Sequence, residues 1–254
     1  MLRSTTITLT AAATTAMLAL SAVPAGASVS PQAWKRTPTH YAAEGAHLGP
    51  GETEPTTTYY QGRRWSRTVT YVVGDSMAGQ VATPVHLARP TWKNKPRTKS
   101  GSAFRLVAGG TTEADQYSTA VLRQMVRDRQ LGRRVIAVVA TQDNSIADWR
   151  STIWRLRVNG IRVRLVTPTP VANRVAHAGD DYTIAHRGIG RWSTLKAAAA
   201  TNTPVVDTYP LVARPAGGGM YRGAIGGTIV QRSGSHVTNG FADRYLTGPI
   251  GRIL

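Results

Sequence analysis

Short runs of apolar and β-branched residues recur along the chain from residue 68 onward, and turn-forming residues bound each run. Five of them are short and rich in apolar and β-branched residues, which is typical of buried strands in a parallel sheet. These runs are Thr68–Val73, Phe104–Ala108, Arg134–Ala140, Arg162–Thr167 and Pro204–Tyr209. The pattern therefore predicts about five buried strands.

Helical patterns separate these runs. Capping-box patterns with Asp in place of the usual Glu mark two helix starts, at Thr112–Asp115 and Ser145–Asp148. An apolar stripe at helical spacing follows the second start, over residues 146, 149, 153 and 156. Further helices are expected over Ile184–Ala200 and from Thr238 to Leu246. Because a parallel crossover needs a long connection, this alternation predicts an α/β fold: a central parallel sheet with helices on both faces.

The first part of the chain has a different composition. A short positive start, an apolar stretch over residues 9–23 and the small residues Ala25-Gly26-Ala27 are typical of a secretory signal peptide. A transmembrane anchor would need ~18–20 apolar residues, and this stretch is shorter and contains threonines. We expect a signal peptide at 1–27, a Thr/Pro/Gly-rich linker or N-terminal arm at 28–66, and one domain at 67–254. The mature protein would be secreted or associated with the cell envelope, with no transmembrane segment.

The charge balance is strongly positive, with 31 Lys and Arg against 13 Asp and Glu, a net charge of +18. In an exported protein this charge favours an anionic cell-wall polymer, an acidic glycan or a lipid surface as partner, and no nucleic acid is expected. The alternative is that the arginines reflect only a GC-rich genome. The loop Thr91–Gly101 combines Trp92 with several cations. It is expected to be a solvated loop, with binding of an anionic or sugar polymer as the alternative.

Several kinds of chemistry are excluded or disfavoured. The chain has no cysteine, which excludes thiolate metal sites, cysteine nucleophiles and disulfides. The histidines outside the last block lack metal-site spacing, and no metal or cofactor is expected. They are His40, His47, His86, His177 and His186. The glycine-rich stretch Gly217–Gly227 does not have the spacing of a phosphate-binding loop and is expected to form a flexible rim.

The first apolar run ends in Gly74-Asp75-Ser76. In an open α/β sheet this places Ser76 beyond the carboxyl end of a strand and at the start of a helix, where a developing negative charge is favoured. The tripeptide alone is also ordinary turn chemistry. However, other polar or glycine residues follow the later runs in order. They are Gly109 and Gly110, then Gln142 and Asn144, and finally His236.

This ordered set resembles the SGNH hydrolases, which include the GDSL esterases and lipases, and the resemblance covers about Thr68 to Leu254. It implies a flavodoxin-like three-layer α/β/α sandwich in which Ser76 is the nucleophile and His236 the base. The N–H groups of Ser76 and Gly109 would form the oxyanion hole, with Gly110 as donor if the register shifts by one. A side-chain amide would complete it; Gln142 occupies the aligned position, while Asn144 has the expected residue type and is preferred here.

One block departs from the family pattern, because Ser233 stands three residues before His236 where the family has aspartate. A hydroxyl can orient an imidazole but supplies no charge. Three outcomes follow: a Ser–His dyad oriented by Ser233 or a main-chain carbonyl, a triad completed by Asp207 or Asp243, or a silent site. We expect a secreted serine esterase acting on acyl or acetyl esters of glycans or lipids. The alternatives are an O-acyltransferase for cell-wall glycan and a catalytically silent, basic envelope-binding protein.

Overall fold

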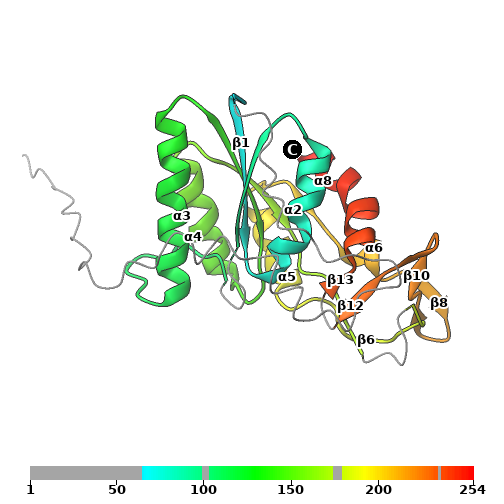
Figure 1. The fold of residues 1–254 in the computed structure, drawn as a ribbon. Coiled ribbons are helices and arrows are strands. Elements are labelled where there is room, and N and C mark those ends of the chain that lie inside the picture. The colour runs from blue at the N-terminus through cyan, green and yellow to red at the C-terminus, as the bar shows by residue number, and fades with distance from the viewer. Residues whose placement is uncertain (1–64, 99–102, 174–178, 234–235) are drawn as a thin grey trace, which may run out of the picture. The chain divides into compact units, whose positions relative to one another are not determined.

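The computed structural model describes residues 65–98, 103–173, 179–233 and 236–254. Its centre is a five-stranded parallel sheet with the strand order β2-β1-β3-β4-β7 (Figure 1). The strands are β1 Thr68–Gly74, β2 Lys93–Thr98, β3 Arg134–Ala140, β4 Arg162–Val166 and β7 Val205–Val206. The predicted α/β fold with a central parallel sheet is confirmed. All five strands run in one direction, so they share one carboxyl end and one amino end of the sheet.

Helices cover both faces of the sheet and give the three-layer sandwich. On one face, α2 packs against the C-terminal π-helix η3 and α8; on the other face, α3 packs on β3 while α4 and α5 pack on β4 and on each other (Figure 1). The bounds are α2 Ser76–Ala88, α3 Glu113–Gln130, α4 Ile146–Val158, α5 Arg191–Ala200, α6 Tyr209–Val212, α7 Asn239–Phe241, η3 Ala242–Leu246 and α8 Thr247–Ile253. Both predicted capping boxes are confirmed, at Thr112 and at Ser145. The helix expected from Thr238 corresponds to α7 and η3, with Thr238 as the N-cap.

The predicted second strand is wrong. Phe104–Ala108 is not a strand, although Phe104 and Leu106 are buried. Side chains of the neighbouring elements satisfy its backbone instead: Phe104 N–H donates to Thr141 Oγ1 at 3.2 Å and Leu106 N–H to Thr152 Oγ1 at 2.8 Å. The apolar run therefore indicates burial here, but this segment does not form the backbone hydrogen bonds to a neighbouring strand that would make it part of the sheet.

The true second strand is Lys93–Thr98, in the segment expected to be a solvated loop. It pairs with β1 along six residues, from Val69 opposite Lys93 to Gly74 opposite Thr98. Because β2 is a border strand of the sheet, it pairs on one side only and tolerates both Pro96 and several cations. Because β2 is polar and contains a proline, the apolar pattern of the sequence did not predict it.

The helix expected over Ile184–Ala200 is shorter than predicted. Its first residues form β6 (Ile184–His186), which pairs with β5 (Val171–Ala172), and α5 begins only at Arg191. The glycine-rich stretch, expected to be a flexible rim, contains two short hairpins, followed by a third that carries His236. The strands are β8 Pro215–Gly217, β9 Met220–Tyr221, β10 Ala224–Ile225, β11 Thr228–Ile229, β12 Gln231–Ser233 and β13 His236–Val237.

The hairpin strands labelled in Figure 1 lie toward the end of the molecule where β1 passes into α2. None of the helices in the described ranges combines the length and apolarity needed to cross a membrane. The predicted signal peptide and nearly all of the predicted arm lie outside the described residues.

Candidate active site

The turn after β1 requires a glycine. Gly74 has a φ of +145°, and a Cβ atom at this position would lie 1.8 Å from the carbonyl oxygen of Ala140 on β3. No other residue fits that close approach of two backbones. Gly74 thereby allows the chain to leave β1 directly into α2, with Ser76 as the first helical residue.

Asp75 holds this turn against the loop that follows β3. Its Oδ1 accepts the Met77 N–H at 2.8 Å and caps the helix, while its Oδ2 accepts the Gln142 N–H at 2.8 Å and the Thr141 hydroxyl at 3.1 Å. The carboxyl is buried, and burial raises its pKa against the lowering effect of these hydrogen bonds. Asp75 therefore acts as a positioning residue that fixes the helix start carrying Ser76.

His236 lies 160 positions after Ser76, and the fold brings its strand to the same helix. The Val237 N–H donates to Oε1 of Gln80 at 3.0 Å, and β13 contacts α2. Gln80 is one helical turn after Ser76, so the two lie on the same side of α2. Ser233 lies opposite His236 in the β12–β13 hairpin. The segment that carries the predicted base thus lies against α2 at Gln80, one helical turn after the predicted nucleophile.

The two candidate amides occupy different surroundings. Asn144 is buried, and its amide donates to the carbonyl oxygen of Phe104 at 2.9 Å. Gln142 is half-buried, and its backbone is bonded directly to Asp75, the residue before Ser76. The structure therefore gives Asn144 a role in holding the 104–106 segment. It leaves Gln142 as the amide-bearing residue adjacent to the serine.

Gly109 and Gly110 lie in the turn before α3. A Cβ atom on Gly110 would meet the Asp115 carboxyl at 2.5 Å, so this glycine packs against the helix start. The segment that leads into this turn is bonded to α3 and α4: Arg105 donates to Asp115 at 2.9 Å, and the Leu106 carbonyl oxygen accepts from Ser151 at 2.6 Å. Because β2 ends at Thr98, the first glycine after it in the sequence is Gly101, which lies outside the described residues.

The two alternative acids lie in different places. Asp207 follows β7, which β3 and β4 separate from β1, and Arg191 holds it in a bidentate ion pair at 2.8 and 2.5 Å. Asp243 is half-buried in η3, which packs against α2. The structure does not bring Asp207 to the serine helix, whereas it places Asp243 on an element that contacts that helix.

Sequence reasoning missed the residues that hold the site together. Gln80 and Thr141 position the serine helix and the histidine strand through the hydrogen bonds described above. The only local signal for Gln80 was a polar residue one turn after Ser76 on a buried helix face. A group of aromatic and basic side chains around Tyr209 was also missed: Arg187 and Arg191 lie over its ring at 5.8 and 4.8 Å. No His, Asp and Glu cluster suited to a metal ion occurs among the residues that the structure describes.

Comparisons with known proteins define the fold. No protein-family model and no curated protein matches the chain. The periplasmic domain of a Salmonella ser. Paratyphi A lipopolysaccharide acetyltransferase matches with a TM-score of 0.58 and 12% identity, covering 85% of this chain and 96% of that chain. A GDSL-like lipase from Bacteroides thetaiotaomicron matches with a TM-score of 0.41 and 17% identity, over 87% of this chain and 100% of that chain.

A third match is the C-terminal catalytic domain of Streptococcus pneumoniae peptidoglycan O-acetyltransferase A, with a TM-score of 0.39 and 15% identity over 74% of this chain and 93% of that chain. Together with the five-stranded parallel sheet, the match with the TM-score of 0.58 shows that the chain shares the α/β fold of that acetyltransferase domain. At sequence identities this low, structural similarity indicates a shared fold and does not indicate a shared activity.

Proposed function

We propose that the protein is a secreted serine enzyme that cleaves carboxylic esters through an acyl-enzyme on Ser76. The observation that carries this proposal is the hydrogen bond from Val237 to Gln80, which holds the strand of His236 against the helix that begins with Ser76. A serine at a helix start and a histidine brought to it from the far end of the chain have no evident packing purpose together.

In the proposed mechanism, the Ser76 hydroxyl attacks the ester carbonyl carbon while His236 takes the hydroxyl proton. The Ser76 N–H and the Gln142 amide donate to the oxyanion of the tetrahedral intermediate, at the helix terminus where the macrodipole favours negative charge. The intermediate then releases the alcohol, which receives the proton from His236. Water, deprotonated by the same histidine, attacks the acyl carbon; the bond to Ser76 Oγ then breaks, His236 returns the proton to this oxygen, and the carboxylic acid is released.

Acyl transfer is the second candidate, because the match with the TM-score of 0.58 is to an acetyltransferase domain. The same residues would form the acyl-enzyme, and a sugar hydroxyl would replace water in the second step. The two functions therefore differ in the acceptor only. An acetylated or acylated glycan would be the substrate of the hydrolase and the product of the acyltransferase.

The test is labelling with a fluorophosphonate probe together with hydrolysis of p-nitrophenyl acetate. We expect the wild-type protein to be labelled and active, and Ser76→Ala to lose both signals. Ser66→Ala is the matched control, because Ser66 precedes β1 at the opposite end of the sheet, and this variant should keep both. Equal background signals in wild type and Ser76→Ala would refute the proposal. Adding a soluble chito-oligosaccharide then separates transfer from hydrolysis by the appearance of an O-acetylated sugar.

A further inference from the structure

Cations occur at the start of four of the five strands of the central sheet. Lys93, Arg134 and Arg162 are the first residues of β2, β3 and β4, and Arg67 directly precedes β1. The register places Lys93 opposite Val69, Arg134 opposite Thr68 and Arg162 opposite Ile136. Because neighbouring strands lie about 4.8 Å apart, the backbones of these residues lie close together at the amino end of the sheet, with their side chains divided between its two faces.

The ends of the helices add further cations to the same end of the sheet. Arg89 follows α2, Arg129 lies in the last turn of α3, and Arg133 lies between α3 and β3. Trp92 lies between Arg89 and Arg134, whose guanidinium groups are 5.5 and 5.6 Å from its ring. Burial, and then the charges of Arg162, Arg134 and Arg157, lower the pKa of Arg164 on β4. These arginines therefore repel one another.

The carboxylates of the described residues provide little compensation there. Asp128 lies at this end but is already bound by Lys95 at 2.6 Å and by Arg133 at 2.5 Å. Other aspartates follow strands or begin helices at the carboxyl end, as Asp75 and Asp115 do. Among the described residues, the amino end of the sheet thus carries more positive than negative charge, since Asp128 pairs only with Lys95 and Arg133.

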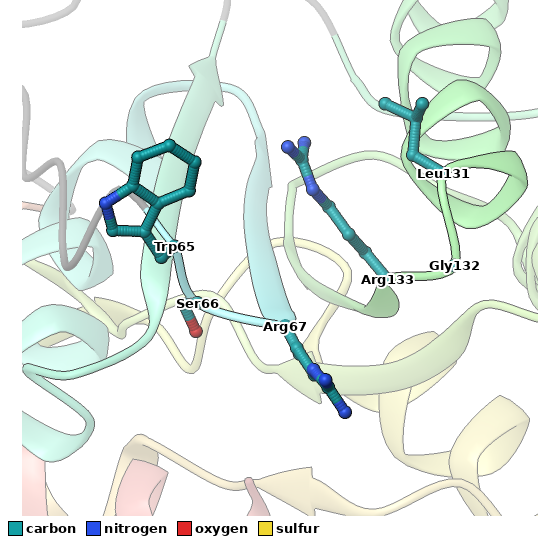
Figure 2. Close-up of a pocket in the computed structure, with 6 residues that line it drawn as sticks. All are labelled: Trp65, Ser66, Arg67, Leu131, Gly132 and Arg133. Atoms are coloured by element: carbon teal, nitrogen blue, oxygen red, sulfur yellow. The ribbon is translucent and has the colours of Figure 1, made fainter.

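An open cavity of about 270 Å³ lies within this basic end (Figure 2). It is lined by Trp65, Ser66, Arg67, Leu131, Gly132 and Arg133. The residues Trp65 and Leu131 are 85% and 64% exposed, which is unusual for such large apolar residues. Figure 2 shows the Arg133 side chain extending between Trp65 and Leu131. In this view the Arg133 guanidinium group thus lies between two largely exposed apolar side chains, while the Arg67 side chain extends in the opposite direction.

We propose that the amino end of the sheet docks on an anionic lipid surface, with its cations toward the lipid phosphates and with Trp65 and Leu131 at the boundary between head groups and acyl chains. Arginine forms bidentate hydrogen bonds with phosphate, and tryptophan is favoured at the boundary between head groups and acyl chains. A soluble polyanion would engage the cations but would gain little from Trp65 and Leu131. Docking in this orientation leaves the carboxyl end of the sheet, with Ser76, on the side away from the lipid.

The first test is co-sedimentation of the full chain with vesicles of phosphatidylcholine alone or with phosphatidylglycerol added. We expect binding to the anionic vesicles only. Each basic residue near such a surface contributes roughly a fivefold gain in affinity, so Arg67→Gln/Arg162→Gln should weaken binding about 25-fold. The control Arg123→Gln/Arg150→Gln removes the same charge from exposed positions within α3 and α4 and should change binding much less. All variants share residues 1–64, so any contribution from that region cancels. Equal loss in both double variants would overturn the proposal.

The second test distinguishes a lipid surface from a polymer. Trp65→Ala/Leu131→Ala keeps every charge and should weaken vesicle binding at least fivefold while leaving binding to heparin unchanged. If the variant binds vesicles as tightly as wild type, and heparin displaces the wild-type protein from them completely, the partner is an anionic polymer and the lipid proposal is wrong. Labelling of Ser76 is measured on the same samples, so failure of the docking proposal is separate from failure of the proposed enzyme function.

Discussion

The carboxyl end and the amino end of the sheet use charge in opposite ways. At the carboxyl end, Asp75, Asp115 and Asp148 each accept backbone N–H groups at a helix start. At the amino end, helix termini and strand starts carry arginines, and Asp128 is surrounded by cations. Both arrangements follow the polarity of the helices, whose N-termini favour negative charge and whose C-termini favour positive charge.

This comparison explains how one basic chain provides two different surfaces. The helix start at the carboxyl end suits a reaction that develops negative charge on an oxygen atom. The same helix polarity, combined with a net charge of +18, concentrates uncompensated cations at the other end. Three predictions test whether the two ends depend on geometry, on charge or on single hydrogen bonds.

The largest expected effect concerns the backbone of the carboxyl end. Gly74→Ala places a Cβ atom 1.8 Å from a β3 carbonyl oxygen and also requires a φ of +145°. We expect a loss of more than about 4 kcal/mol, or no folded protein, since the clash adds to backbone strain of ~1–3 kcal/mol. The control at the amino end is Gly132→Ala, which has a positive φ but nothing within 4 Å of the added atom. It should cost only about 1 kcal/mol in urea unfolding. Similar losses in both variants would show that the positive φ, and not the contact with the Ala140 carbonyl oxygen, is what requires glycine at position 74.

The second effect concerns charge at the amino end. Burial alone would raise the pKa of Asp128, but hydrogen bonds from Lys95 and Tyr71 and the charge of Lys95 outweigh it and lower the pKa. Removing one partner of a buried ion pair costs ~3–5 kcal/mol, and partial exposure of Lys95 and Arg133 reduces this, so Asp128→Asn should cost roughly 2–3 kcal/mol at pH 7.

The pH dependence of this effect has a definite sign. Because the folded-state pKa of Asp128 is lowered, its contribution is present above the unfolded pKa of about 3.9 and is lost as pH falls through the folded value. The unfolding free energies of wild type and Asp128→Asn should therefore begin to converge below about pH 4 and come together only below the lowered folded-state pKa. A difference between the two proteins that stays constant from pH 7 to pH 3 would contradict the ionised, paired state of Asp128.

The smallest effect on stability concerns one hydrogen bond of the carboxyl end. Gln80→Met removes the acceptor of the Val237 N–H and should cost ~1–3 kcal/mol, because that buried N–H loses its partner. It should also lower kcat for p-nitrophenyl acetate with little change in KM, since the strand of His236 is no longer fixed. Gln116→Met, at an exposed position on α3, is the control and should change neither quantity. Unchanged kcat in Gln80→Met would show that this bond does not position the histidine.

The sequence predicted those parts of the fold whose signals are local. β1 and β3 are buried on both faces and β4 buries Val163, Leu165 and Val166, so their composition alone indicates strands, and the capping boxes at Thr112 and Ser145 need only four residues each. Lys93–Thr98 could not be found this way, because a border strand gains its hydrogen bonds from β1 and needs no apolar run. Phe104–Ala108 was wrongly predicted as a strand because it is apolar and buried. Its backbone N–H groups donate to threonine side chains and not to a neighbouring strand.

The candidate site shows the same division. Ser76 follows directly from the strand and the helix start, so its position at the carboxyl end could be derived from the sequence. The choice between Gln142 and Asn144 as oxyanion donor remains a prediction, and the hydrogen bond from the Asn144 amide to the Phe104 carbonyl could not be derived, because it depends on how the 104–106 segment packs. The assignment of Gly109 depended on the incorrect second strand, and its predicted role as an oxyanion donor remains a prediction together with the later candidate Gly101. The partner of His236 likewise remains a prediction.

The composition of β2 has a consequence for association between molecules. A border strand exposes unpaired backbone groups and can recruit a strand from another chain, which leads to aggregation. In β2, Pro96 has no N–H to offer, and Lys93, Lys95 and Arg97 would bring like charges together if two copies aligned. At the opposite border, β7 is only two residues long and offers a very short template. Both edge strands of the sheet thus disfavour edge-to-edge association with another chain. This matters because the chain has no disulfide to limit unfolding.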